Sequence, residues 1–237
     1  MNISLEFAEI IGAHIGDGTL YKTNSNSIVW EIRGSLEEKE YYEHLKELIL
    51  KIYNIKVIPK FRSGGKNGCW GIQTSKKEIT SSFLNMNFLP ETKTYTIAVP
   101  HYILNSEINI KRAFVRGLFD TDGCIRFDKF KKKKEYVFPR IEFTFASSPL
   151  RDSLKILLES MKFNKISIWG KEKTFHLSCS GKEMTKKWFL EIKPKNSKHL
   201  KKYAYWLINK QYNKELCNAT VAQPGTALTQ KQQAIVT

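Results

Sequence analysis

An internal repeat constrains what this chain can fold into more than any other feature of its sequence. The segment IGAHIGDGTL (11–20) recurs as RGLFDTDGCI (116–125), and each ends its apolar run in an aspartate followed by a glycine. The two aspartates, Asp17 and Asp122, lie 122 − 17 = 105 positions apart. The same offset relates two further pairs of segments, SKKEIT to SGKEMT and PETK to KNSK. Because self-similarity at a fixed period indicates a repeated structural unit, the chain is predicted to hold two copies of one fold.

Each copy has the pattern of one subdomain that contains both helices and antiparallel strands. Hydrophobic periodicity predicts helix, two strands, helix, two strands and helix, and the first helices are expected at 5–16 and 107–121. Capping patterns predict where four other helices begin, at Ser35–Glu38, Ser75–Glu78, Ser148–Pro149 and Ser180–Glu183. The predicted fold class is α+β, with two pseudosymmetric αββαββα subdomains at 1–104 and 105–216 and a flexible tail at 217–237.

A strong excess of basic residues predicts a polyanionic partner. The chain carries 39 lysines and arginines against 23 aspartates and glutamates, a net charge of +16, which is typical of proteins that bind nucleic acid. It has no run of about 18 apolar residues and no secretion signal at MNISLEFAEI, so a membrane is not expected as a partner. The four cysteines show no CxxC spacing, which predicts reduced thiols. We therefore expect an intracellular protein, in the cytoplasm of a prokaryote or in an organelle matrix.

Each repeated helix carries a glycine in its interior and an aspartate at its end. Glycine within a helix costs about 1 kcal/mol relative to alanine, so Gly12 and Gly117 indicate two helices that pack backbone against backbone. That packing would bring Asp17 and Asp122 side by side at one end of a twofold seam. An aspartate before a capping glycine is by itself a common turn, but its duplication at one offset favours a functional pair of acids.

The segments IIGAHIGDG (10–18) and VRGLFDTDG (115–123) resemble the two signature helices of the LAGLIDADG homing endonucleases in their single-chain form with two motifs. The resemblance extends over about residues 5–212. It implies a monomer with no obligate protein partner, in which two sheets form a DNA-binding saddle and the two motif helices join the subdomains. The first motif keeps its acid but departs from the family pattern at Ala13, His14 and Gly16.

The resemblance also implies a metal-dependent site at the ends of the motif helices. In the family the last acid of each motif, here Asp17 and Asp122, binds a divalent metal and cleaves one DNA strand. The carbonyl groups of Gly16 and Thr121 would be further metal ligands. Oxygen donors of this kind suit Mg²⁺, which can generate a hydroxide and neutralise charge at a phosphodiester. Mg²⁺ or Mn²⁺ is therefore the expected cofactor, and Ca²⁺ is expected to bind without supporting cleavage.

Two lysines at matching positions complete the predicted catalytic set. Lys93 and Lys198 lie 198 − 93 = 105 positions apart and resemble the basic residues that the family places near each scissile phosphate. A lysine there can stabilise the negative charge that develops in the transition state. Two other polar residues of the motif helices are expected to have different roles. His14 is predicted to be a packing residue, and Asp120 a cap or a structural polar group.

Alternation along the strands places the polar side chains of each sheet on one face. Arginine and lysine suit guanine, glutamine and asparagine suit adenine, and glutamate can accept a hydrogen bond from cytosine in the major groove. The hairpin tips KTNSNS (22–27) and KFKKKKEY (129–136) suit phosphate contacts, which position DNA without specifying its sequence. The residues predicted to bind DNA are Lys22, Asn24, Asn26, Glu31, Arg33, Lys60, Arg62, Lys66, Gln73, Arg126, Asp128, Lys129, Lys131, Arg140, Glu142, Thr144, Lys171 and His176.

These features together predict a sequence-specific homing endonuclease, encoded within an intron, that makes a metal-dependent, staggered double-strand cut in a long double-stranded DNA target. Two alternatives on the same fold stay open. One is an intron maturase whose partner is RNA, and the other is a regulator that binds DNA without cleaving it. The presence of both acids argues against a loss of cleavage, and a regulator gives no reason for two acids at matched positions.

Overall fold

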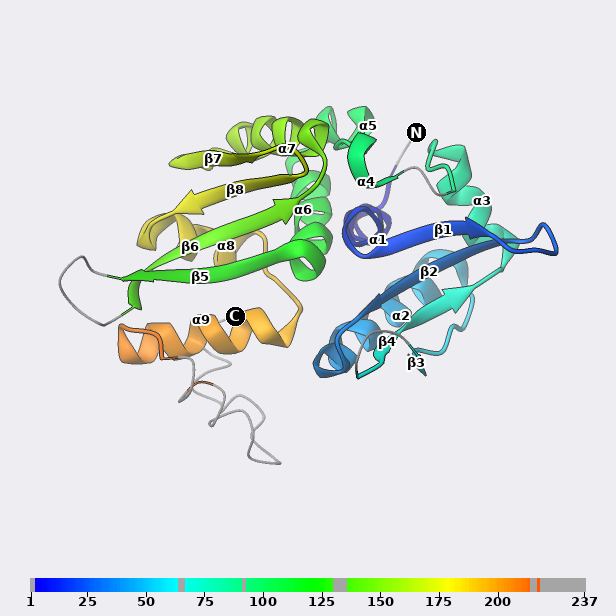
Figure 1. Cartoon of the computed structure of the whole chain (residues 1–237), viewed down its shortest axis with the longest axis horizontal. Helices are drawn as coiled ribbons and strands as arrows, with labels where there is room; N and C mark the ends of the chain where they lie inside the picture. The colour runs from blue at the N-terminus through cyan, green and yellow to red at the C-terminus, as the bar shows by residue number, and fades with distance from the viewer. Residues whose placement is uncertain (1–2, 64–66, 91–92, 130–135, 214–216, 218–237) are drawn as a thin grey trace.

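Two four-stranded antiparallel sheets lie side by side, with a pair of packed helices between them (Figure 1). These helices are α1 (Leu5–Gly16) and α6 (Ile108–Asp122), which carry the two repeated motifs. The predicted α+β fold with two similar antiparallel sheets is therefore confirmed. Lys66, Lys131 and all of the predicted tail after residue 217 lie outside the described part of the chain. The computed structural model describes residues 3–63, 67–90, 93–129, 136–213 and 217.

The first sheet has the strand order β1-β2-β4-β3. Its elements after α1 are β1 (Gly18–Lys22), β2 (Ile28–Gly34), η1 (Leu36–Glu38), α2 (Lys39–Tyr53), β3 (Lys60–Arg62), β4 (Cys69–Thr74) and α3 (Lys77–Asn85). The helices α2 and α3 pack against the sheet, and the rings of Trp30 and Phe83 stack there with centroids 5.4 Å apart. Two short helices, α4 (Lys93–Thr96) and α5 (His101–Leu104), then lead into α6.

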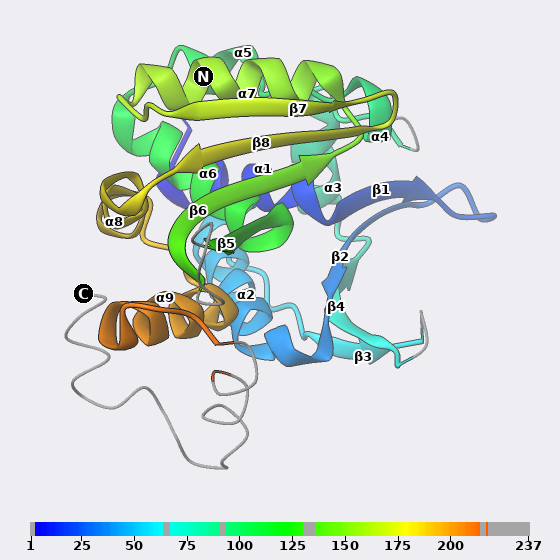
Figure 2. The same cartoon turned by 60° about the vertical axis from the view of Figure 1, so that its left-hand side comes forward.

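The second sheet repeats this arrangement with the order β5-β6-β8-β7. Its elements after α6 are β5 (Gly123–Lys129), β6 (Tyr136–Phe145), α7 (Ser148–Ser160), β7 (Ile166–Lys171), β8 (Thr174–Ser180), α8 (Lys182–Glu191) and α9 (Ser197–Asn209). The rings of Phe119, Phe143 and Trp188 meet in the core between this sheet and its helices. The helix α9 is not among the predicted elements, and it lies beside β5 after the repeated unit has ended (Figures 1 and 2).

The strand registers show that the two sheets are equivalent. Thr19 is paired with Glu31 in the first sheet, and Cys124 is paired with Glu142 in the second. The first members of these pairs are 124 − 19 = 105 positions apart, whereas their partners are 142 − 31 = 111 positions apart. The repeat therefore keeps one offset through the motif helices and the strands that follow them. The offset changes at the hairpin, which is longer in the second copy.

Of the four predicted capping patterns, one is present, one is shifted by one residue and two are absent, although α3 and α8 begin within two residues of their predicted caps. The capping box at Ser35–Glu38 is present and opens η1. Ser147, rather than Ser148, caps α7 and accepts a hydrogen bond from the backbone of its first turn. The helices α3 and α8 begin without the capping boxes predicted at Ser75 and Ser180. At most two residues separate the strands β4 and β8 from these helices.

Candidate functional site

The helices α1 and α6 approach each other so closely that their backbones touch. A Cβ atom added to Gly12 would lie 2.0 Å from the carbonyl oxygen of Phe114, and one added to Gly117 would lie 1.9 Å from that of Glu9. Both distances are far below the 3.0 Å under which real Cβ contacts are essentially never found. The predicted backbone-to-backbone packing is therefore confirmed, and it requires glycine on both helices.

The seam between these helices ends at the two motif acids. Asp17 is the C-cap of α1, and its backbone N–H donates to the carbonyl oxygen of Ala13 at 3.1 Å. Asp122 is the last residue of α6, and both acids are partly buried. A Cβ atom added to Gly16 would lie 3.4 Å from the carboxyl carbon of Asp122. The second acid therefore lies against the residue that precedes the first, at the same end of the seam.

The oxygen donors at this end of the seam fit a hard divalent cation. They are the two carboxylates and the nearby backbone carbonyl groups, and Mg²⁺, Mn²⁺ and Ca²⁺ prefer such oxygens. Gly16 keeps the space between the helices narrow, because a Cβ atom there would meet the hydroxyl of Thr121 at 2.0 Å. Among the described residues, His, Cys, Asp and Glu side chains form no cluster of three or more that could hold a metal.

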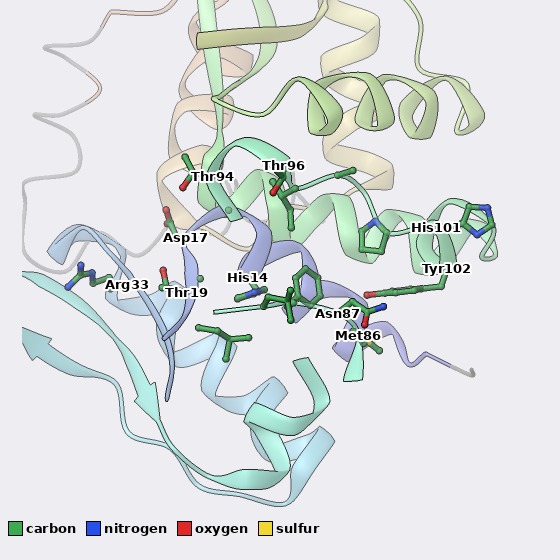
Figure 3. A pocket seen from close by; sticks show the side chains of 18 residues that line it. His14, Asp17, Thr19, Arg33, Met86, Asn87, Thr94, Thr96, His101 and Tyr102 are labelled. Carbon is green, nitrogen blue, oxygen red and sulfur yellow. The ribbon is translucent and has the colours of Figure 1, made fainter. Parts of the chain in front are cut away.

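A cavity of about 860 Å³ opens beside Asp17 (Figure 3). The end of α1, the strand β1 and the segment that contains α4 and α5 line this cavity. Figure 3 shows Asp17, Thr19, Arg33 and Thr94 toward one end and Tyr102 toward the other. The first motif acid therefore faces open space together with an arginine of the sheet, rather than the core.

Lys198 lies at the junction of the two halves, in the first turn of α9. Its Nζ donates to Oε1 of Glu38 in η1, at 2.5 Å. Nδ2 of Asn196 lies 2.7 Å from the same oxygen and 2.8 Å from the carbonyl oxygen of Asp120 in α6, and it donates to both. Glu38 is only 8% exposed, so a nearly buried carboxylate holds the lysine. The amine of Lys198 is thereby tied to elements of both halves.

The segment at the end of the first copy makes the opposite connection, from the first half to the second. Lys93 begins α4, and its side chain lies outside the described part of the chain. Further along, the carbonyl oxygen of Ile97 accepts a hydrogen bond from Oγ of Ser147, and the backbone N–H of Val99 donates to Oγ of Ser153. Ser147 is the N-cap of α7 in the second half, and Ser153 lies within that helix. Each predicted lysine is therefore carried by a segment that is attached to the other half.

His14 and Asp120 have the structural roles that the sequence predicts. His14 is 2% exposed, and its Nδ1 accepts a hydrogen bond from Nε1 of Trp30 at 3.2 Å while its ring packs on Phe83. The carboxyl group of Asp120 is fully buried and accepts a hydrogen bond from the backbone N–H of Lys195 at 2.7 Å. Burial raises the pKa of Asp120 to about 8. Asp120 therefore points into the protein, although it lies only two residues before the second motif acid.

Most of the residues predicted to bind DNA lie on the polar faces of the two sheets or in their hairpins. The exposed ones are Lys22, Asn24, Asn26, Arg33, Lys60, Arg126, Asp128, Lys129, Thr144 and Lys171. The partly buried ones are Glu31, Arg62, Gln73, Arg140 and His176. Glu142 differs from all of these, because it is 1% exposed and pairs with Arg126 and Arg140. The structure thus covers the carboxylate that the sequence predicts to contact cytosine.

Aromatic residues on these faces are missing from the sequence-based set, among them Tyr21 and Trp169. Tyr21 accepts a hydrogen bond from Nε2 of Gln73, and the ring of Trp169 stacks on His176 with centroids 5.0 Å apart. Tyr21 follows the exposed Thr19 at a period of two, so strand alternation could have found it. Trp169 faces His176 across β7 and β8, and that register is known only once the strands are paired.

Comparison with known sequences supports the LAGLIDADG resemblance. Residues 109–193 match the family described as LAGLIDADG-like domain. The uncharacterized protein MJ1054 of Methanocaldococcus jannaschii is 29% identical over 164 residues, which cover 67% of this chain and 17% of that protein. This chain therefore spans only a small part of the length of that relative.

Solved structures of homing endonucleases share the fold. I-DmoI in complex with DNA and Mn is 20% identical, with a TM-score of 0.56 over 81% of this chain and 97% of that chain. The meganuclease I-SmaMI, bound to uncleaveable DNA, is 12% identical, with a TM-score of 0.55 over 84% of this chain and 88% of that one. I-WcaI, bound to its DNA recognition sequence, is 18% identical, with a TM-score of 0.51 over 81% and 82%.

The paired sheets and the glycine seam thus define a two-domain, single-chain protein with the fold of the homing endonucleases. Residues 109–193 of the second copy match the LAGLIDADG-like domain, in agreement with the resemblance that the two motifs show. Within the described residues, no helix is both long enough and apolar enough to cross a membrane.

Proposed function

We propose that this chain is a monomeric, intron-encoded homing endonuclease that makes a staggered double-strand cut in a long, specific DNA target. The observation that carries the proposal is the convergence of Asp17 and Asp122 at one end of the seam. The two strands of a duplex present two scissile phosphates, and two acids beside a twofold axis supply one acid to each. DNA binding alone would not require these acids to meet.

The residues at the end of the seam would position a divalent cation against the DNA. The carboxylates of Asp17 and Asp122, with the carbonyl groups of Gly16 and Thr121, are the proposed ligands. A bound Mg²⁺ or Mn²⁺ supplies a nucleophile at neutral pH and neutralises charge on the phosphate. The structures of I-DmoI with DNA and Mn and with DNA and Ca support a divalent metal here, and we expect Ca²⁺ to permit binding without cleavage.

Lys198 and Lys93 would place positive charge near the two cuts. The ion pair of Lys198 with Glu38 fixes its amine on an element that contacts both halves, so its position depends on the seam. A fixed ammonium group beside a scissile phosphate stabilises the charge that develops during hydrolysis. We propose the corresponding role for Lys93 from its matching position in the repeat.

The polar faces of the two sheets would each bind one half of the target. Exposed lysines and arginines there suit phosphates and base edges, and the chain has a net charge of +16. I-DmoI, I-WcaI and I-SmaMI were each solved with DNA, which supports a DNA partner over the RNA partner of a maturase.

Substitution of each acid by asparagine tests the proposal. A target is first selected from a randomised pool of duplex DNA by binding in Ca²⁺, and it is then cloned into a supercoiled plasmid. We expect the Asp17→Asn and Asp122→Asn proteins to bind this target but to produce no linear plasmid with Mg²⁺. The matched control is Asp152→Asn, an exposed acid of α7 that pairs with Arg151, and it should cut like the unmodified protein.

Two results would contradict the proposal in different ways. If either asparagine variant linearised the plasmid at the unmodified rate, the assignment of the acids would be wrong. If the unmodified protein bound the selected target but left it intact with both Mg²⁺ and Mn²⁺, the chain would be a DNA-binding regulator instead.

A further inference from the structure

Three charged residues of the second sheet lie together on its polar face. Arg126 of β5 and Arg140 of β6 are direct cross-strand partners, and Glu142 follows Arg140 at a period of two. Directly opposed residues of an antiparallel pair have Cα atoms about 4.5–5.5 Å apart, so all three side chains share one small area. This face is opposite to the one that Ile125 and Ile141 bury in the core.

Both carboxylate oxygens of Glu142 have arginine partners in this arrangement. Its Oε1 lies 2.9 Å from Nε of Arg126, and its Oε2 lies 2.9 Å from both Nε and Nη2 of Arg140. Nδ1 of His176 lies 3.8 Å from Oε1 on a third side. A carboxylate that is nearly buried is stable only when it is paired and hydrogen-bonded in this way. Glu142 therefore serves the arginines and has no accessible oxygen for a base.

Arg140 is also fully engaged. Besides the two hydrogen bonds to Glu142, its Nη1 donates to Oδ2 of Asp128 at 2.8 Å. Its guanidinium lies 5.6 Å from the ring centroid of Trp169, and its side chain is 26% exposed. All three of its nitrogens therefore have carboxylate partners. Arg140 therefore holds the two carboxylates in place and has no pair of unbound N–H groups to offer to a base.

Arg126 differs from Arg140 in the way that matters for recognition. It contacts Glu142 through Nε and also hydrogen-bonds Cys124, and its side chain is 55% exposed. The Nη1–Nη2 edge of a guanidinium can donate two parallel hydrogen bonds to O6 and N7 of guanine in the major groove. We infer that Arg126 recognises a guanine in the half-site under the second sheet, and that Glu142 and Arg140 are positioning residues that hold it ready. This inference rests on the proposed binding of duplex DNA by the sheets.

The first sheet lacks this arrangement, although the register makes the positions comparable. Glu31 is equivalent to Glu142, but the positions equivalent to Arg126 and Arg140 are Tyr21 and Val29, which are paired with each other. Glu31 lies 3.8 Å from Nε of Arg62 of β3, which is longer than the contacts of Glu142. A guanine preference that depends on Arg126 is therefore expected only in the half-site under the second sheet. Holding the side chain in place before binding lowers the entropy that DNA binding costs.

Selection of targets from a randomised duplex pool, by binding in Ca²⁺, tests the inference without using cleavage. We expect the unmodified protein to prefer guanine at one position of one half-site by about 5- to 150-fold, the range for a bidentate arginine pair. Arg126→Ala should remove the preference at that position and leave the others intact. The control is Lys129→Ala, an exposed cation of the same strand, which should weaken binding evenly for all sequences and reduce its salt dependence.

The positioning role of Glu142 needs a separate readout. Glu142→Gln should weaken the guanine preference at the same position, and combining it with Arg126→Ala should cause no further loss there. Thermal unfolding of each variant identifies any that fails to fold, and Arg126→Ala keeps the test decisive in that event because it changes an exposed side chain.

Three other results would contradict the role of Arg126, the division of roles between the two arginines, or the proposed function itself. A uniform loss of affinity in Arg126→Ala would make Arg126 a phosphate contact, and the inference would be wrong while the proposed nuclease stood. Loss of the guanine preference in Arg140→Ala, with the preference kept in Arg126→Ala, would reverse the two roles. Failure of the unmodified protein to enrich any duplex would overturn the inference together with the proposed function.

Discussion

Substitution of Gly117 by alanine would place a methyl group where α1 and α6 touch. The new Cβ atom would lie 1.9 Å from the carbonyl oxygen of Glu9 and 2.8 Å from the backbone nitrogen of Ala13. Since real Cβ contacts begin at about 3.0 Å, the helices would have to separate by at least 3.0 − 1.9 = 1.1 Å. The obstructing atoms are backbone atoms, so they cannot rotate away as the end of a side chain could.

The expected loss of stability follows from two opposing effects. Overpacking of a close contact costs about 1–3 kcal/mol, and a rigid backbone contact lies at the upper end of that range. Alanine recovers about 1 kcal/mol because it favours the helix over glycine. We therefore expect the free energy of unfolding to fall by about 2 kcal/mol. In a chain of this size that corresponds to a decrease in Tm of roughly 4–8 °C.

The same displacement would move Asp17 relative to Asp122 at the end of the seam. A misplacement of about 1 Å in a catalytic arrangement can cost on the order of 100-fold in rate. Gly117→Ala is therefore expected to cleave the selected plasmid far more slowly, even at a temperature where it is fully folded. Rates of linearisation at saturating protein measure this effect separately from binding.

The control is Asn109→Ala, which introduces alanine at an exposed position in the first turn of the same helix. It should leave both Tm and the cleavage rate close to their unmodified values. If Gly117→Ala melted at or above the unmodified temperature and cleaved at the unmodified rate, the backbone contact between the helices would be refuted.

Two further predictions concern polar residues at the junction. Burial raises the pKa of Asp120 to about 8, so the folded protein holds this proton more tightly than the unfolded chain, and stability is lost as the pH rises from about 4 through about 8. Asp120→Asn should reduce the slope of the unfolding free energy against pH by up to about 1.4 kcal/mol per pH unit, as measured by urea titrations between pH 5 and 8. If the slope did not change, the pH dependence would come from other groups. Lys198→Met should slow plasmid cleavage on the order of 100-fold with DNA affinity nearly unchanged, because the amine is proposed to act on the transition state. An equal loss of affinity and rate, measured by filter binding and linearisation, would make Lys198 a binding residue.

The helices at the ends of the two copies show why part of the fold could not be predicted. The repeat offset relates residues 198–209 of α9 to residues 93–104, because 198 − 105 = 93 and 209 − 105 = 104. In the first copy Pro100 lies within this stretch, and the chain forms α4 and α5 instead of one helix. Proline in a helix interior removes a hydrogen bond and clashes with the preceding turn. A unit defined by what both copies share therefore ends before α9.

The candidate site also has one part that the sequence periodicity predicts and another that it does not. Glycines and acids at one offset were enough to predict the seam, since a backbone contact between two helices depends on few residues. Alternation assigns Glu142 correctly to the polar face but says nothing of its depth. That depth depends on Arg126 and Arg140, which come from two strands whose register is fixed only by pairing. Strand alternation therefore predicts the face but not which of its residues are accessible.

The polar contacts along the seam also bear on the proposed monomer. Glu9 of α1 is 2% exposed, and it accepts hydrogen bonds from Arg116 of α6 at 2.6 and 2.8 Å and lies 2.7 Å from Nε2 of His44. Burial alone would raise the pKa of Glu9, but His44 and Arg116 lower it, so the carboxylate is charged. In the repeat, the positions equivalent to Glu9 and Arg116 are Phe114 and Ile11, each 105 residues away.

This asymmetry determines which helices can pair. Two chains joined through a pair of α1 helices would bury two Glu9 carboxylates without the guanidinium of Arg116. Removing one partner of a buried ion pair costs about 3–5 kcal/mol, so that arrangement is strongly disfavoured. The helix α1 is therefore selective for α6, and a connection within one chain gives that pairing a high effective concentration. The Glu9–Arg116 pair thus favours a seam made inside each molecule, with one copy of each acid, over a seam between two molecules.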